Sequence, residues 1–135
     1  MATLLARASA RNPEMVNMCA QMAGNSVTTN IIERGPSHKS GCVRITTAVG
    51  STPTCTYKIE VSADGTTWGD ATYADISTPN TDSTATFAIT TATVATKVIK
   101  QPTFWRFLRV TTSLNTNVTN TIDFLYDDSQ TPPWS

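Results

Sequence analysis

Apolar and polar residues alternate with a period of two along most of this chain. The clearest run is 104–111 (Phe-Trp-Arg-Phe-Leu-Arg-Val-Thr), in which leucine and valine alternate with large aromatic residues. Because successive side chains of a strand point to opposite faces, this run predicts a strand that is covered on both faces. Similar runs recur at intervals of about eight to twelve residues with turn residues between them, as in β-sandwiches and jelly rolls. The sequence therefore predicts an all-β, antiparallel β-sandwich or jelly roll of about eight strands, with 104–111 as a central strand.

Turn residues divide the predicted strands from one another. Gly-Ser-Thr-Pro at 50–53 predicts a tight turn, so the strands on either side are expected to form a hairpin. Matching their apolar faces places Val49 opposite Cys55 and fixes the register. The central strand is expected to pair with 118–126 across a second turn. The other expected strands are 26–33, 41–49, 54–62, 67–76, 84–90 and 93–99.

The first 25 residues have a different pattern and are expected to form a separate arm and helix. Asn-Pro-Glu at 12–14 predicts a helix start, with asparagine as the cap and proline in the first turn. Met15, Met18 and Met22 follow at helical spacing and give the expected helix an apolar face. Methionine suits adaptable contact surfaces, so this face packs either on its own domain or on a neighbouring subunit.

Both ends of the chain are expected to extend beyond the sandwich, which occupies residues 26–126. Residues 1–12 contain Leu4 and Leu5 and are expected to form a flexible arm. The tail at 127–135 ends in Pro-Pro-Trp-Ser and is expected to be extended. Trp134 is costly to leave in water, so it either folds back on the sandwich or inserts into a partner.

Composition narrows the classes of function. Charged residues make up 15% of the chain and the net charge is zero, which gives no electrostatic case for nucleic acid as a partner. Threonine supplies about one residue in five and keeps the outer face of a sheet polar. Three cysteines with no Cys-x-x-Cys spacing indicate reduced thiols. No apolar run approaches the roughly 18 residues that cross a bilayer, so no membrane partner is expected.

Residues that could carry catalysis are sparse. His38 is the only histidine and lies among turn residues, so neither a metal cluster nor a nucleophile–base pair is expected. We therefore expect no enzyme activity and no cofactor. Trp68 and Tyr73 are candidate sugar-stacking residues. Arg106 and Arg109 are expected either to form a structural ion pair, for example with Asp123, or to face a ligand or subunit.

Two stretches resemble known families. Residues 59–68 (Ile-Glu-Val-Ser-Ala-Asp-Gly-Thr-Thr-Trp) resemble the S-x-D-G-x-x-W hairpin of discoidin-like, galactose-binding-like sandwiches, and 105–110 (Trp-Arg-Phe-Leu-Arg-Val) resembles their late strand. The chain lacks the disulfide pair that flanks those modules. The same stretches also resemble small all-β virion proteins of tailed bacteriophages, of the head-decoration or cement type.

The phage resemblance implies a structural virion protein, made in the host cytoplasm, that binds and stabilises the assembled lattice of the major capsid protein, as a homotrimer. The interface is expected at the ends of the chain, through Leu4, Leu5, Met15, Met18, Met22 and Trp134. Many weak copies would then act together through avidity. The alternative is a carbohydrate-binding module or a phage tail-fibre adhesin that stacks sugars on Trp68 and Tyr73.

Overall fold

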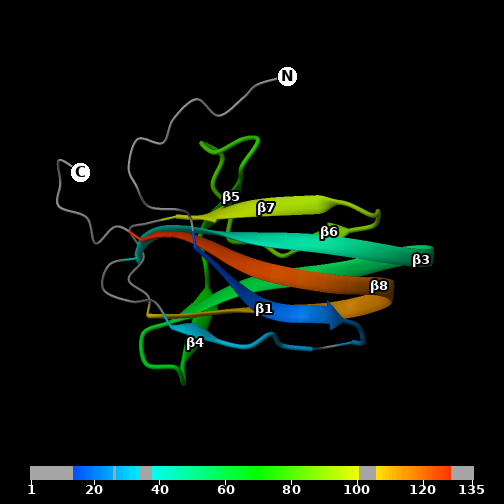
Figure 1. The fold of residues 1–135 in the computed structure, drawn as a ribbon, viewed down its shortest axis with the longest axis horizontal. Helices are drawn as coiled ribbons and strands as arrows, with labels where there is room; N and C mark the ends of the chain where they lie inside the picture. Colours follow the sequence, from blue (N-terminus) through cyan, green and yellow to red (C-terminus); the bar gives the residue numbers. More distant parts are fainter. Residues whose placement is uncertain (1–13, 26, 34–37, 101–105, 129–135) are drawn as a thin grey trace.

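The computed structural model describes residues 14–25, 27–33, 38–100 and 106–128. Within these ranges the chain is all-β, with every strand pairing antiparallel and no helix, which confirms the predicted fold class (Figure 1). The strands are β1 (Glu14–Met22), β2 (Ile32–Glu33), β3 (His38–Ser62), β4 (Trp68–Asp70), β5 (Tyr73–Asp75), β6 (Phe87–Ile89), β7 (Val94–Ile99) and β8 (Phe107–Asp128).

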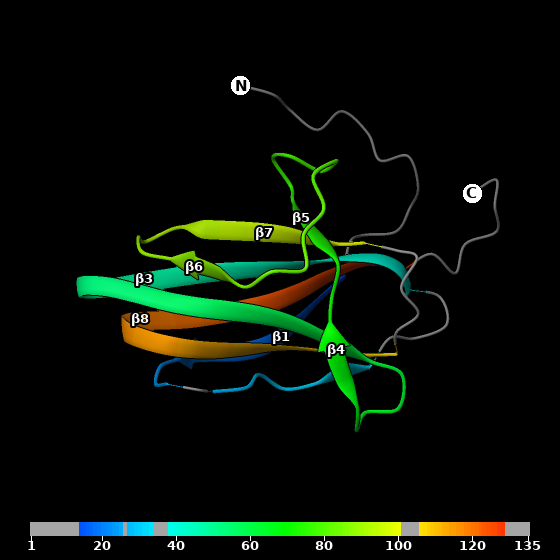
Figure 2. The same cartoon turned by 180° about the vertical axis from the view of Figure 1, so that it is seen from behind.

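Two long strands, β3 and β8, form the framework of the fold. They pair with each other along nearly their whole length, from Gly41 opposite Tyr126 to Ser62 opposite Phe107. The pairing is irregular near 50–53 of β3 and 114–117 of β8, where the two-stranded ribbon bends back on itself (Figure 2). Positive φ angles at Thr52 (44°), Leu114 (51°) and Asn117 (55°) accompany this bend.

The bend divides one hydrogen-bonded sheet into two layers. In the first layer the strand order is β1, the second half of β8, the first half of β3, β7 and β5. In the second layer β2 pairs with the first half of β8, and β4 and β6 pair with the second half of β3. The result is a β-sandwich in which β3 and β8 belong to both layers. The prediction of a central strand is confirmed over 107–111, since this part of β8 has β3 on one side and β2 with Thr28 on the other, while 104–105 lie outside the described residues.

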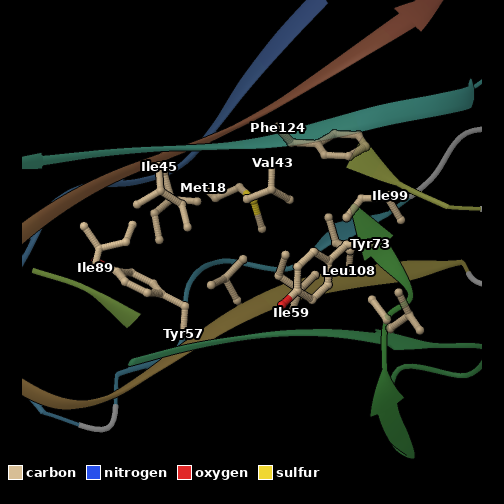
Figure 3. Packing of buried hydrophobic residues seen from close by; sticks show 14 of the residues in the cluster. Met18, Val43, Ile45, Tyr57, Ile59, Tyr73, Ile89, Ile99, Leu108 and Phe124 are labelled. Atoms are coloured by element: carbon tan, nitrogen blue, oxygen red, sulfur yellow. The ribbon is translucent and has the colours of Figure 1, made fainter. Parts of the chain in front are cut away.

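The core lies between the two layers. Val43 and Ile45 point inward from the first layer, and Tyr57 and Ile59 point inward from the second (Figure 3). Each of these four side chains is at most 2% exposed. Fully burying an aliphatic or aromatic side chain of this kind contributes about 1.5–3 kcal/mol, so this inner face holds the two layers together.

A buried polar contact also joins the layers. The hydroxyl of Tyr57, in the second layer, donates to Oδ1 of Asn120 in the first layer. Nδ2 of Asn120 in turn donates to Sγ of Cys55 at 3.8 Å. All three residues are fully buried, and burial raises the pKa of the Tyr57 hydroxyl, so it stays protonated and remains a donor.

The predicted hairpin across 50–53 and the predicted pairing of the central strand with 118–126 are wrong. Val49 pairs with Val118 of β8 and not with Cys55, and Cys55 pairs with Ile89 of β6. The two halves of β3 do turn back at 50–53, but their apolar faces meet across the core and not side by side. For the same reason the stretches 107–111 and 118–126 do not pair with each other, because they are opposite halves of β8. Alternation alone is compatible with either arrangement.

The predicted helix after residue 12 is also wrong, since Glu14–Met22 forms strand β1. The register of β1 against β8 shifts between Asn17 and Cys19 and again between Cys19 and Met22, and Gln21 has a φ of 51°. Each shift inserts extra residues and changes the phase of the alternation. Because of these shifts, core-facing side chains of β1 such as Met18 and Met22 are four residues apart. The same spacing marks one face of a helix, so the sequence pattern is the same for both.

The predicted strands 41–49 and 54–62 are the two halves of β3, and 118–126 lies within β8, whereas the remaining predicted strands are shorter than expected. The range 26–33 contributes β2 and a single bridge between Thr28 and Thr111, and 67–76 contains two strands, β4 and β5. The hairpin expected from the S-x-D-G-x-x-W resemblance is present, since Ser62 pairs with Trp68. In its turn Gly65 has a φ of 80°, and the Asp64 carboxylate accepts the backbone N–H groups of Thr66 and Thr67 at 2.8 Å. These bonds lower the pKa of Asp64.

Candidate interaction surfaces

The residues predicted to form an interface are not brought together as a group. Leu4, Leu5 and Trp134 lie outside the described residues. The three methionines are in β1, where Met18 is fully buried in the core and Met22 is half-buried against it, while Met15 is 55% exposed. The expected methionine face is therefore divided between the core and the surface.

The two candidate sugar-stacking residues also separate. Tyr73 is 6% exposed, packs in the core and donates its hydroxyl to the Ala85 carbonyl at 2.7 Å, so its ring is not offered to solvent. Trp68 is half-buried on the outer face of the second layer, with the Arg109 guanidinium 4.0 Å from its ring centroid. The pair does not form a common platform.

Arg106 and Arg109 form structural ion pairs, but not with the partner that the sequence suggested. Arg109 donates through Nε to Glu60 at 3.0 Å, and Arg106 approaches Glu33 at 2.6 Å. Asp123 instead pairs with Arg44 at 3.2 Å. The prediction failed because it paired the two halves of β8, which lie in different layers.

The described residues hold no group of three or more His, Cys, Asp or Glu side chains that could bind a metal ion. The three cysteines, Cys19, Cys42 and Cys55, are free thiols. Burial raises the pKa of all three thiols, which disfavours the nucleophilic thiolate. In the ranges that the structure covers, no helix is long and apolar enough to span a membrane.

The most distinctive surface lies where the ribbon bends. No residue between Arg44 and Lys58 on β3, or between Arg109 and Asp123 on β8, is charged. At about 3.3 Å per residue, each half-strand is free of charge for roughly 20 Å before the bend. We call this part of the molecule the uncharged end; it comprises 19–25, 46–56, 90–95 and 111–121 (right side of Figure 1).

Neighbouring segments extend the uncharged end. The turn that follows β1 and the turn that precedes β7 both lie beside the bend, and neither carries a charge. Hydrogen bonds fix the second turn, since Thr47 donates its N–H to the Thr93 carbonyl at 2.9 Å and its hydroxyl to the Thr91 carbonyl at 2.7 Å. The charged residues among the described ranges are thus confined to the rest of the sandwich.

Large apolar side chains are exposed at the uncharged end. Leu114 is 69% exposed, Val94 60% and Val49 36%. Beside them the end of β1 and the two bends enclose an open hollow of about 530 Å³, with Gly24 and Asn117 among its lining residues. Exposed apolar residues without surrounding charge are typical of the cores of protein interfaces.

The amide side chains around the hollow brace the bend. Nδ2 of Asn115 donates to the carbonyls of Gly24 and Val118 at 3.0 Å, and its Oδ1 accepts the Val118 N–H at 3.1 Å. Nδ2 of Asn117 donates to the Ser51 carbonyl at 2.7 Å. These bonds hold the three turns in a fixed arrangement. Because this surface carries no charge, a partner can bury it without removing a charged group from water, a step that would cost free energy.

The sequence reasoning missed this surface although its signal is present in the sequence. The signal is the spacing of charged residues, which leaves long uncharged runs around 50 and around 115. Each run by itself looks like an ordinary polar turn. The runs become one surface because β3 and β8 bend at the same place.

No protein-family model and no curated protein matches the sequence. Among solved structures, the chain is similar to the crystal structure of the SPBc2 prophage-derived protein YomS. The TM-score is 0.57 with 8% sequence identity, and the match covers 90% of this chain and 100% of that chain. At this identity the likeness establishes the fold, and it does so over nearly the full length of both chains.

Proposed function

We propose that this chain is a structural protein of a bacteriophage particle, of the capsid decoration type, and that it binds the assembled capsid lattice through the uncharged end. The observation that carries the proposal is the combination of three exposed apolar residues, Val49, Val94 and Leu114, with a braced surface that has no charge. The likeness to a prophage-derived protein supports the phage assignment. In this role the protein is a non-enzymatic component of the virion.

Binding through such a surface has a physical signature. Attraction between exposed charges weakens as salt shortens the Debye length, whereas apolar burial does not depend on it in this way. We therefore expect capsid binding that persists at about 0.5 M NaCl. Because a capsid offers many equivalent sites, each contact can be modest and occupancy can still be high.

The test is co-sedimentation with undecorated capsid shells of the phage that encodes the chain. Leu114→Lys places a charge in the proposed contact, and because the wild-type side chain is already exposed the variant should fold normally. We expect binding to fall at least about tenfold, equivalent to about 1.4 kcal/mol. The matched control is Thr66→Lys, an exposed threonine in the turn between β3 and β4.

Equal binding by wild type and Leu114→Lys, or a loss confined to Thr66→Lys, would exclude the uncharged end as the docking surface. The adhesin alternative predicts instead that Trp68→Ala abolishes binding to a glycan array and leaves capsid binding intact. A glycan hit that depends on Trp68, without capsid binding, would replace our proposal.

A further inference from the structure

A row of apolar side chains crosses the outer face of the first layer from one edge to the other. Backbone pairing aligns its members in adjacent strands: Ala74 of β5 with Val98 of β7, Val98 with Cys42 of β3, Cys42 with Leu125 of β8, and Leu125 with Met15 of β1. Val43 and Phe124, the chain neighbours of two of them, point into the core, so the row points outward.

This row is unusual for the outer face of a sandwich, which normally carries polar side chains opposite the apolar inner face. Cys42, Val98 and Leu125 are half-buried, Met15 at one edge is 55% exposed, and Ala74 at the other edge is only 1% exposed. The row lies on the other side of Arg44 from the uncharged end, and the outer face of the first layer continues from the row into that end.

We propose that this face binds a second copy of the chain, forming a dimer whose two-fold axis runs parallel to β3 between the two facing sheets. Among the members of the row that retain exposure, the side chains increase in size from Val98 on one side of Cys42 to Leu125 and Met15 on the other. A two-fold axis over Cys42 sets the large end of each row against the small end of the other. Side chains of complementary size then fill the contact, as close packing requires.

The area of the face is sufficient for a dimer. Three stretches of about nine residues, in β1, β3 and β8, and the six residues of β7, spaced by about 4.8 Å at about 3.3 Å per residue, present roughly 520 Å² per copy. Two copies would bury roughly 1,050 Å², just above the approximately 1,000 Å² that a specific interface should exceed.

The charges beside the row are compatible with burial. Arg44 pairs with Asp123 at 3.2 Å, and Nδ2 of Asn17 donates to the same carboxylate at 2.8 Å, so this group is neutral in each copy. With the axis along β3, the Arg44 side chains of the two copies face each other, and each stays paired with its own Asp123. Neither charge is left without an opposite charge nearby, which is the condition for burying charged groups at an interface.

The test uses the cysteine at the centre of the row. Cys55 is buried in the core and Cys19 packs against it, so among the described cysteines Cys42 is the one on this face. The axis brings Cys42 opposite the Cys42 of the second copy at the roughly 10 Å that separates facing sheets, which is too far for a disulfide but within reach of a short bis-maleimide linker. Treatment of the full chain with such a linker should therefore give a covalent dimer on a denaturing gel. The dimer should disappear in Cys42→Ser and persist in Cys19→Ser.

Native mass spectrometry of the reduced chain gives an independent measurement. We expect a dimer at about 100 µM and a loss of affinity of at least about a hundredfold in Leu125→Glu, which places a charge in the row. Thr56→Glu, on the outer face of the second layer, is the matched control and should remain dimeric. A thermal melt of each variant checks that it is folded.

Three results would overturn the proposal. A trimer, as the phage resemblance suggested, would require a different symmetry. A monomer at this concentration would mean that another partner or another segment of this chain covers the row. A dimer that survives both Leu125→Glu and Cys42→Ser would place the contact elsewhere. None of these measurements involves capsids, so failure of the dimer and failure of capsid binding are distinguishable.

Discussion

The hydrogen bond between Tyr57 and Asn120 gives the most direct test of the folded-ribbon architecture. The two residues are far apart in sequence and lie in opposite layers, and both are fully buried. They can meet only if β3 and β8 bend back as described. Tyr57→Phe removes the donor hydroxyl while keeping the ring that stacks on Phe87 at 5.2 Å.

The expected loss of stability in Tyr57→Phe comes from the buried acceptor that the substitution leaves behind. Oδ1 of Asn120 loses its donor in a site that water does not reach. An unsatisfied buried polar atom costs about 1–3 kcal/mol, a substantial part of the roughly 5–15 kcal/mol by which a domain is stable. Asn120→Leu alone should lower the stability by a similar amount, because it leaves the tyrosine hydroxyl without an acceptor. In the double variant both polar partners are gone, so the loss should be smaller than the sum by about 1–3 kcal/mol.

The assay is urea unfolding of the four proteins that form this double-mutant cycle, followed by far-UV circular dichroism. Equal slopes with shifted midpoints would show that stability has changed and the extent of unfolding has not. Strictly additive losses would refute the reasoning, because they would mean that the two side chains do not interact. A destabilisation of Tyr57→Phe below about 0.5 kcal/mol would refute it as well.

Three further predictions concern other parts of the fold. Met18→Ala should lower the free energy of unfolding by about 2–5 kcal/mol and Met15→Ala by less than about 0.5 kcal/mol, whereas a helical methionine face would make the two losses similar. Gly41→Ala should cost about 1–3 kcal/mol in a thermal melt, because the added Cβ would overlap the ring of Phe124. Burial raises the pKa values of Tyr57 and of the three thiols above their ordinary 10.0 and 9.0, so the folded state holds protons that the unfolded state releases. Stability should therefore be constant below about pH 9 and fall above it, by up to about 1.4 kcal/mol per pH unit for each group, and urea midpoints that stay constant to about pH 11 would contradict this.

The sequence predicted which residues are inside but not which strands are neighbours. The alternation that placed Ile45 and Tyr57 on apolar faces is correct, and both are fully buried. A hairpin sets two such faces side by side, whereas a folded ribbon sets them against each other across a core. Both arrangements remove the same side chains from water, so the pattern of apolar residues cannot distinguish them. The difference lies in the backbone partners of each strand, which side-chain alternation does not encode.

The incorrect prediction of a helix in the segment that forms β1 has a separate cause. Met18 and Cys19 are adjacent in sequence, yet both pack on the core, because the register of β1 against β8 shifts beside them. A bulge of this kind depends on the partner strand, about a hundred residues away in sequence. The cap residues and methionine spacing were local signals for a helix. Pairing with β8 and burial of Met18 overrode them, as tertiary contacts commonly do.

The candidate surface could be located only by combining the sequence with the bend. Charge spacing alone identifies uncharged runs near 50 and 115, and many domains contain such runs as solvated turns. In this chain β3 and β8 are paired, so a bend in one strand requires a bend in the other at the same level. Both runs therefore meet at one end of the sandwich, with Val49 and Leu114 exposed between them. The same ribbon that closes the core thus separates the charged part of the protein from a surface that a partner can bury without desolvating a charge, and this separation is why we assign binding to that end.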